Sequence, residues 1–138
     1  MRLKIQRNDR IFITGRSGSG KTYLAKEIIR RNKAYTFVII DILDIYGDLD
    51  GLNNVHRFVI DPLDEERLNK IIRAGLEVGA FFVIDEMHSL PYSRYKLLRY
   101  LILAGRNKGS GWVAISQFPS QISKTVIGNA NLSFLFEN

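Results

Sequence analysis

The stretch Gly15-Arg16-Ser17-Gly18-Ser19-Gly20-Lys21-Thr22 decides the fold of this chain. It fits the pattern G-x-x-x-x-G-K-[ST] at every position, and it lies between an apolar stretch at residues 11–14 and an amphipathic stretch at residues 21–31. Glycines allow backbone N–H groups to turn toward phosphate oxygens, and a helix that begins here adds a favourable dipole. The stretch therefore predicts a strand, a loop that binds the phosphates of ATP, and a helix.

The last two residues of this loop have side chains that suit a nucleotide with its metal ion. Lys21 supplies a positive charge for the β- and γ-phosphates, and the Thr22 hydroxyl is suited to ligate Mg²⁺. The residues predicted to surround the phosphates with them are Gly15, Arg16, Ser17, Gly18, Ser19 and Gly20. A chance Gly- and Ser-rich turn is the alternative, and the flanking strand and helix patterns count against it.

A second motif, Phe81-Phe82-Val83-Ile84-Asp85-Glu86, is an apolar stretch that ends in two carboxylates. Asp85 is predicted to hold the Mg²⁺ shell together with Thr22, and Glu86 to polarise the water that attacks the γ-phosphate. The simpler alternative is that two acids mark the exit of a strand into solvent. A water-activating Glu favours an ATP hydrolase over a small-molecule or nucleoside kinase, which has to exclude water.

Short β-rich stretches alternate with amphipathic helical patterns along the chain. Strands are predicted at residues 10–14, 35–40, 55–60, 80–84, 111–116 and 131–136, and helices at residues 21–31, 64–76, 92–104 and 120–127. This alternation predicts an α/β fold with a parallel sheet and helices on both faces, in one ATPase domain over residues 1–138. Residues 1–6 are a candidate for an extra edge strand, and the acidic residues 41–54 are predicted to form an exposed loop.

The composition excludes several classes of protein. Hydrophobic residues make up 46% and charged residues 25% of the chain, which is typical of a globular protein. The absence of Cys excludes a disulfide scaffold, a Cys nucleophile and Cys-ligated zinc. Because no apolar run is long enough to span a bilayer and no signal-peptide pattern opens the chain, we expect no membrane insertion and a cytoplasmic protein, in the host if it is viral.

The net charge of +6 is distributed unevenly. Residues 1–34 carry a net charge of +8, residues 35–86 carry −7 and residues 87–138 carry +5. Two basic ends suit a polyanionic partner such as nucleic acid, and a well-solvated basic surface is the alternative. Candidate phosphate contacts are Arg94, Lys96 and Arg99, which have no acids near them in the sequence.

The C-terminal third carries the most specific pattern. The stretch AGRNKGSGWVAISQFPSQI at residues 104–122 is followed by GNANLSFLF at residues 128–136. Placed after the Asp85-Glu86 pair and a helix, this order resembles the FtsK/HerA superfamily of P-loop ATPases, and most of all its compact viral genome-packaging members. The resemblance extends from about residue 11 to the C-terminus.

The resemblance implies a three-layer RecA/ASCE-like P-loop NTPase fold with a mostly parallel sheet and the core strand order 5-1-4-3-2. It implies an oligomeric ring that moves double-stranded DNA by Mg²⁺-dependent ATP hydrolysis, in viral genome packaging, with a capsid or portal protein as a candidate partner. It places Gln117 near the γ-phosphate as a polar sensor, and it makes Arg106 the arginine that reaches a γ-phosphate, that of a neighbouring subunit.

Alternatives remain for the two residues and for the whole protein. Gln117 is otherwise an ordinary strand terminator, and Arg106 is otherwise a cation at the C-terminus of a helix, where the dipole favours it. A phage assembly or secretion-type P-loop ATPase is one alternative to the DNA motor. A small-molecule or nucleoside kinase is the other.

Overall fold

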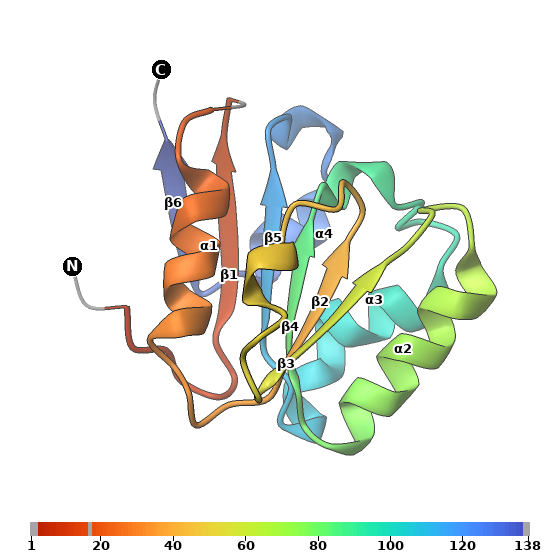
Figure 1. The fold of residues 1–138 in the computed structure, drawn as a ribbon. Coiled ribbons are helices and arrows are strands. Elements are labelled where there is room, and N and C mark those ends of the chain that lie inside the picture. Colours follow the sequence, from red (N-terminus) through yellow and green to blue (C-terminus); the bar gives the residue numbers. More distant parts are fainter. Residues whose placement is uncertain (1–2, 17, 137–138) are drawn as a thin grey trace.

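The structure is a computed structural model that describes residues 3–16 and 18–136. The strands are β1 Arg10–Gly15, β2 Phe37–Asp41, β3 Val55–Val59, β4 Phe81–Asp85, β5 Trp112–Ser116 and β6 Leu132–Phe136. The helices are α1 Lys21–Arg30, α2 Glu65–Glu77, α3 Lys96–Ala104 and α4 Lys124–Asn129 (Figure 1). Short 3₁₀ turns lie at Gly47–Leu49, Met87–Ser89, Gly105–Lys108 and Pro119–Gln121.

The strands of the described residues form one sheet in the order β3-β2-β4-β5-β1-β6, and every pair of neighbours is parallel. Without the edge strand β3, the order β6-β1-β5-β4-β2 is the implied core order 5-1-4-3-2. The predicted α/β class and three-layer P-loop NTPase architecture are therefore confirmed, with an all-parallel sheet. Ligands of such sheets bind beyond the carboxyl ends of the strands.

Helices cover both faces of the sheet because its strands are apolar on both sides. Ile13 of β1 packs with Ile28 on the face that α1 covers, and Phe12 packs with Leu101 and Val126 on the face of α2, α3 and α4 (Figure 1). All residues of β2, β4 and β5 are buried, as expected of strands enclosed between two helical layers. No helix in the described part of the chain is long and apolar enough to cross a membrane.

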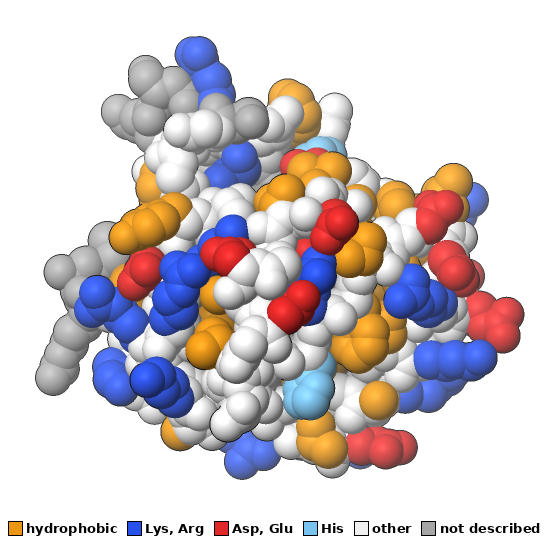
Figure 2. Space-filling model, in the orientation of Figure 1, with side chains coloured by type: hydrophobic (Ala, Val, Ile, Leu, Met, Phe, Trp, Pro, Cys, Tyr) orange, Lys and Arg blue, Asp and Glu red, His pale blue; other side chains and the backbone are white. Residues whose placement is uncertain are grey.

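The prediction of an exposed loop at residues 41–54 is confirmed for most of the segment but is wrong for Asp41, Tyr46 and Leu49, which are buried. Asp41 and Tyr46 are fully buried, and Tyr46 belongs to the core on the α1 face. The guanidinium of Arg57 on β3 pairs at 2.6–3.0 Å with three carboxylates of this segment: Asp41, Asp44 and Asp50. Figure 2 shows acidic side chains beside basic ones on this face of the molecule. Acid-rich composition indicates solvent exposure, but these tertiary ion pairs allow the segment to pack against the sheet.

The prediction of an edge strand at residues 1–6 is also wrong for residues 3–6, which form no strand; residues 1 and 2 lie outside the described residues. The side chains of Asn32 and Tyr35 form the hydrogen bonds to the backbone of this segment that a neighbouring strand would otherwise form. The Asn32 side chain accepts the Ile5 N–H at 3.1 Å and donates to the Leu3 carbonyl at 2.7 Å, and the Tyr35 hydroxyl donates to the Ile5 carbonyl at 3.1 Å. Because these bonds satisfy the backbone, the segment packs without joining the sheet.

Two predicted helices are shorter than their sequence patterns indicate. The helix predicted at residues 92–104 begins at Lys96, because the N–H groups of Arg94 and Tyr95 bond to the Pro91 carbonyl in a preceding turn. The helix predicted at residues 120–127 is divided into the turn Pro119–Gln121 and α4. The Ser123 hydroxyl accepts the Thr125 N–H at 3.2 Å, and this cap sets the start of α4.

Candidate nucleotide-binding site

A cavity of about 330 Å³ lies at the carboxyl ends of β1, β4 and β5. Its lining consists of Gly18, Gly20, Lys21, Thr22, Tyr23, Leu43, Ile45, Asp85, Glu86 and Gln117. The glycine-rich loop, the acid pair and Gln117 are far apart in the sequence. They meet because β1, β5 and β4 are parallel neighbours that end at the same edge of the sheet.

The glycine-rich loop turns sharply between β1 and α1. Gly18 and Gly20 have φ angles of 80° and 101°, which residues with a side chain rarely adopt. The N–H of Leu24 bonds to the Gly20 carbonyl at 2.9 Å, so α1 begins directly after the loop with its N-terminus toward the cavity. Of the other predicted phosphate-binding residues, Gly15 ends β1, Arg16 follows it and Ser19 lies between Gly18 and Gly20, and Ser17 lies outside the described residues.

The side chain of Lys21 is buried beneath this loop. Lys21 is 7% exposed, and its Nζ donates a hydrogen bond to the Arg16 carbonyl at 3.2 Å. A buried ammonium group gains more from an anion than from a neutral carbonyl, because burial removes its hydration. A phosphate group in the cavity would therefore be the better partner for Lys21.

Replacing Lys21 with Ala should weaken ATP binding about 10- to 100-fold, because a hydrogen bond to a charged group contributes roughly 1.5–3 kcal/mol. Titration with a fluorescent ATP analogue measures this change. Lys33→Ala, which removes an exposed cation beyond the end of α1, is the matched control and should bind as the wild type does. Equal affinity of Lys21→Ala and wild type would contradict the assignment of the loop to phosphate.

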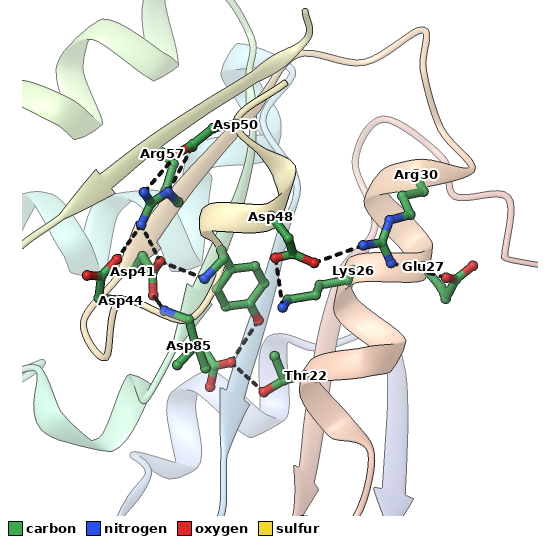
Figure 3. Close-up of polar contacts among 12 residues, drawn as sticks. Thr22, Lys26, Glu27, Arg30, Asp41, Asp44, Asp48, Asp50, Arg57 and Asp85 are labelled. Carbon is green, nitrogen blue, oxygen red and sulfur yellow. Dashed lines mark hydrogen bonds and ion pairs between the residues drawn. The ribbon is translucent and has the colours of Figure 1, made fainter. Parts of the chain in front are cut away.

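Asp85 is a buried carboxylate that accepts hydrogen bonds from neutral donors (Figure 3). Its Oδ2 accepts from the Thr22 hydroxyl at 2.9 Å and from the Tyr46 hydroxyl at 2.7 Å. Its Oδ1 accepts from the backbone N–H of Glu86 at 2.9 Å. The adjacent oxygens of Thr22 and Asp85 are the hard ligands that Mg²⁺ prefers, and Mg²⁺ commonly takes one or two protein oxygens beside phosphates and water. The two residues predicted to hold Mg²⁺ therefore fit that ion.

Tyr46 is the residue at this site that no sequence pattern indicated. Burial in the core, and then the negative charge of Asp85, raise the pKa of Tyr46 well above its ordinary value of 10.0, so that its hydroxyl is a hydrogen-bond donor. The one signal in the sequence is an aromatic residue within an acidic segment that directly follows a strand. Leu43 and Ile45, from the same segment, also line the cavity.

Glu86 has an unusual backbone and a defined side-chain partner. Its φ and ψ of 66° and 40° are left-handed, which costs roughly 1–2 kcal/mol for a residue with a Cβ. Its Oε2 lies 2.8 Å from Nε2 of His88, whose Nδ1 lies 2.8 Å from the Ser116 hydroxyl at the end of β5. The side chain of Glu86 is thus tied to the strand end that carries Gln117. Backbone strain of this kind is concentrated at functional sites.

Arg106 does not join this group of residues. It is exposed in the turn Gly105–Lys108, where its Nη1 donates to the Leu103 carbonyl at 3.1 Å. This turn precedes the amino end of β5, whereas the cavity lies at the carboxyl end, and a strand of this length spans roughly 15 Å. In Figure 1 the turn lies near the bottom of the sheet and the glycine-rich loop at the top. Arg106 therefore cannot reach phosphates bound by its own chain.

The parallel sheet, the glycine-rich loop between β1 and α1, and the acid pair after β4 define a P-loop NTPase. More specifically, the chain belongs to the AAA domain family, which matches residues 5–117. The chain is thus a P-loop ATPase. No curated protein sequence is similar to it at a significant level.

Several solved structures share its fold. The genome-packaging NTPase B204 of Sulfolobus turreted icosahedral virus 2, in complex with ATP-γ-S, has a TM-score of 0.78 at 18% identity, over 97% of this chain and 77% of that chain. The DNA-packaging ATPase B204 of Sulfolobus turreted icosahedral virus has a TM-score of 0.71 at 16% identity, over 94% and 76%. The cytoplasmic domain of EssC has a TM-score of 0.68 at 14% identity, over 94% and 31%. The predicted resemblance to compact viral genome-packaging ATPases is confirmed at the level of the fold.

Proposed function

We propose that this chain is the Mg²⁺-dependent ATPase of a motor that moves double-stranded DNA, acting as an oligomeric ring in viral genome packaging. The observation that carries the ATPase part is one cavity lined by Lys21, Thr22, Asp85, Glu86 and Gln117. The DNA-packaging part is supported by the likeness to the B204 fold and by the basic ends of the sequence.

In this proposal each of these five residues has one task. The loop amides and Lys21 bind the β- and γ-phosphates of ATP. Thr22 and Asp85 hold Mg²⁺, and the chemistry that the ion supplies when bound is neutralisation of charge on the phosphates. Glu86 accepts a proton from the attacking water, and Gln117 contacts the γ-phosphate. Arg106 of a neighbouring subunit stabilises the charge that develops on the transferred phosphoryl group.

The rate of ATP hydrolysis with and without linear double-stranded DNA tests this proposal. We expect hydrolysis that requires Mg²⁺, that DNA stimulates, and that rises more steeply than linearly with protein concentration while subunits assemble. Sedimentation at the same concentrations measures the assembly directly. A strict requirement for a small phosphoryl acceptor would indicate a kinase instead. Hydrolysis that is indifferent to DNA would indicate an assembly or secretion-type ATPase.

A hollow between α2 and α3 offers a basic surface for the DNA backbone. Its lining is Glu65, Asn69, Arg73, Arg94, Lys96, Leu97 and Tyr100. Arg94 and Lys96 are exposed there, so both side chains are free to contact phosphates of the DNA backbone. Arg99, predicted with them, instead donates to the carbonyls of Tyr92 and Ser93, and so it holds the turn that precedes α3.

Replacing Arg94 and Lys96 together with Ala should lower the salt dependence of DNA binding. The slope of log affinity against log salt concentration should fall by about 2, because each cation on a phosphate releases about one counterion. Fluorescence anisotropy with labelled DNA over a series of salt concentrations measures the slope. The double variant Lys33→Ala/Lys124→Ala removes two exposed cations elsewhere and should keep the wild-type slope. An equal fall in both variants would show that the hollow is not the DNA surface.

A further inference from the structure

Two buried carboxylates stand side by side at the edge of the sheet that forms the cavity. Asp41 ends β2, Asp85 ends β4, and the two are register partners of these neighbouring strands. Asp41 is paired with the guanidinium of Arg57 at 3.0 Å. Asp85 accepts bonds from two hydroxyl groups and one backbone N–H, all of them neutral. These hydrogen bonds thus fix the orientation of the Asp85 carboxylate and leave its negative charge unneutralised. A ligand of a cation requires both.

Tyr46 lies between these two carboxylates and contacts both of them. Its backbone N–H donates to Asp41 Oδ2 at 2.9 Å, and its hydroxyl donates to Asp85 Oδ2 at 2.7 Å. The N–H of Ile45 donates to the other Asp41 oxygen at 3.0 Å. Asp41, itself held by Arg57, therefore fixes the backbone from which the Tyr46 hydroxyl reaches Asp85.

The ring of Tyr46 is held as firmly as its backbone. It is fully buried in the core on the α1 face, and the Lys26 ammonium lies 5.4 Å from the ring centroid. Lys26 is in turn paired with Asp48 at 2.9 Å. A donor with so little freedom helps to fix the orientation of the carboxylate that accepts its hydrogen bond.

We propose that Tyr46 is a positioning residue, which directs the Asp85 carboxylate toward Mg²⁺ and raises the affinity of the site for the ion. The inference rests on the proposed function, which assigns Mg²⁺ to Thr22 and Asp85. A neutral hydroxyl suits this task better than a cation would, because it orients the carboxylate and leaves its charge for the metal. Removing a residue that hydrogen-bonds to a metal ligand without contacting the metal commonly lowers metal affinity by about 10- to 100-fold.

The test compares nucleotide binding with and without the metal ion. Tyr46→Phe keeps the ring in the core and removes only the hydroxyl. The Kd of a fluorescent ADP analogue is measured in EDTA and in saturating Mg²⁺, and the ratio of the two values is the gain that Mg²⁺ provides. We expect Tyr46→Phe to lower this gain about 10-fold and to leave the affinity in EDTA unchanged.

Tyr35→Phe is the matched control. It also removes a hydroxyl, which lies away from the cavity and donates to the Ile5 carbonyl at a distance of 3.1 Å. Tyr35→Phe should therefore keep the wild-type gain in affinity from Mg²⁺. Thermal unfolding of both variants separates a metal effect from a loss of stability. Asp41→Asn weakens the acceptor of the Tyr46 backbone N–H. It should also lower the gain from Mg²⁺, by a smaller factor than Tyr46→Phe does.

The outcomes separate this inference from the proposed function. An unchanged Mg²⁺ gain in folded Tyr46→Phe and Asp41→Asn would overturn the inference, and Tyr46 would then be a core residue whose hydroxyl merely needs a partner. A wild-type protein that binds nucleotide without any gain from Mg²⁺ would overturn the metal assignment of the proposed function, and this inference with it. A lowered gain in Tyr46→Phe with a normal gain in Tyr35→Phe would support it.

Discussion

Arg106→Ala should bind ATP as the wild type does and hydrolyse it about 10³-fold more slowly, which is the lower end of the effect of an arginine on a γ-phosphoryl group. The expected split between binding and turnover follows from the position of Arg106. It is exposed at the edge of the sheet opposite the cavity, so its own chain binds ATP without it. Binding of a fluorescent ATP analogue and steady-state hydrolysis measure the two quantities.

Mixing two inactive variants tests whether Arg106 acts on a neighbour. A mixture of Arg106→Ala and Lys21→Ala should recover part of the activity, because some interfaces then combine an intact phosphate loop with an intact arginine from the other subunit. Lys108→Ala removes an exposed cation from the same turn and should keep wild-type turnover. No recovery on mixing, together with a specific activity that does not depend on concentration, would mean that Arg106 has a structural role only.

Glu86→Gln should retain ATP binding and lower kcat by about 10²-fold or more, because an amide cannot accept the proton of the attacking water. The substitution preserves the size of the side chain. Its amide can still bond to His88, which lies 2.8 Å from the present carboxylate, so the local structure should persist. Single-turnover hydrolysis of pre-bound ATP measures the chemical step directly.

Glu77→Gln is the control for this charge change, since Glu77 is exposed at the end of α2. It should hydrolyse ATP at the wild-type rate and bind it with the same affinity. If Glu86→Gln turned over ATP at the wild-type rate, Glu86 would have no part in activating water. It would then only mark the end of β4 and contact His88.

The nucleotide loop and the sheet could be predicted from the sequence because their signals are local. The positions of Gly18 and Gly20 require left-handed backbone that glycine adopts without strain, and the pattern around them is contiguous. Buried parallel strands such as β4 are continuous apolar runs, and the acids that end β4 follow directly in the chain. The parallel order then brings Gln117 to the same edge, which the resemblance of the C-terminal third had implied.

Only the tertiary structure decided the surroundings of Asp85. Tyr46 lies in a segment whose composition indicates exposure, and it is buried because Arg57, on another strand, neutralises the acids around it. Arg106 lies at the far edge of the sheet because the turn that carries it enters β5 at its amino end. Local periodicity and motifs report the conformation of contiguous residues. The contacts of a side chain with partners distant in the sequence depend on how the elements pack, and a linear pattern carries no signal for them.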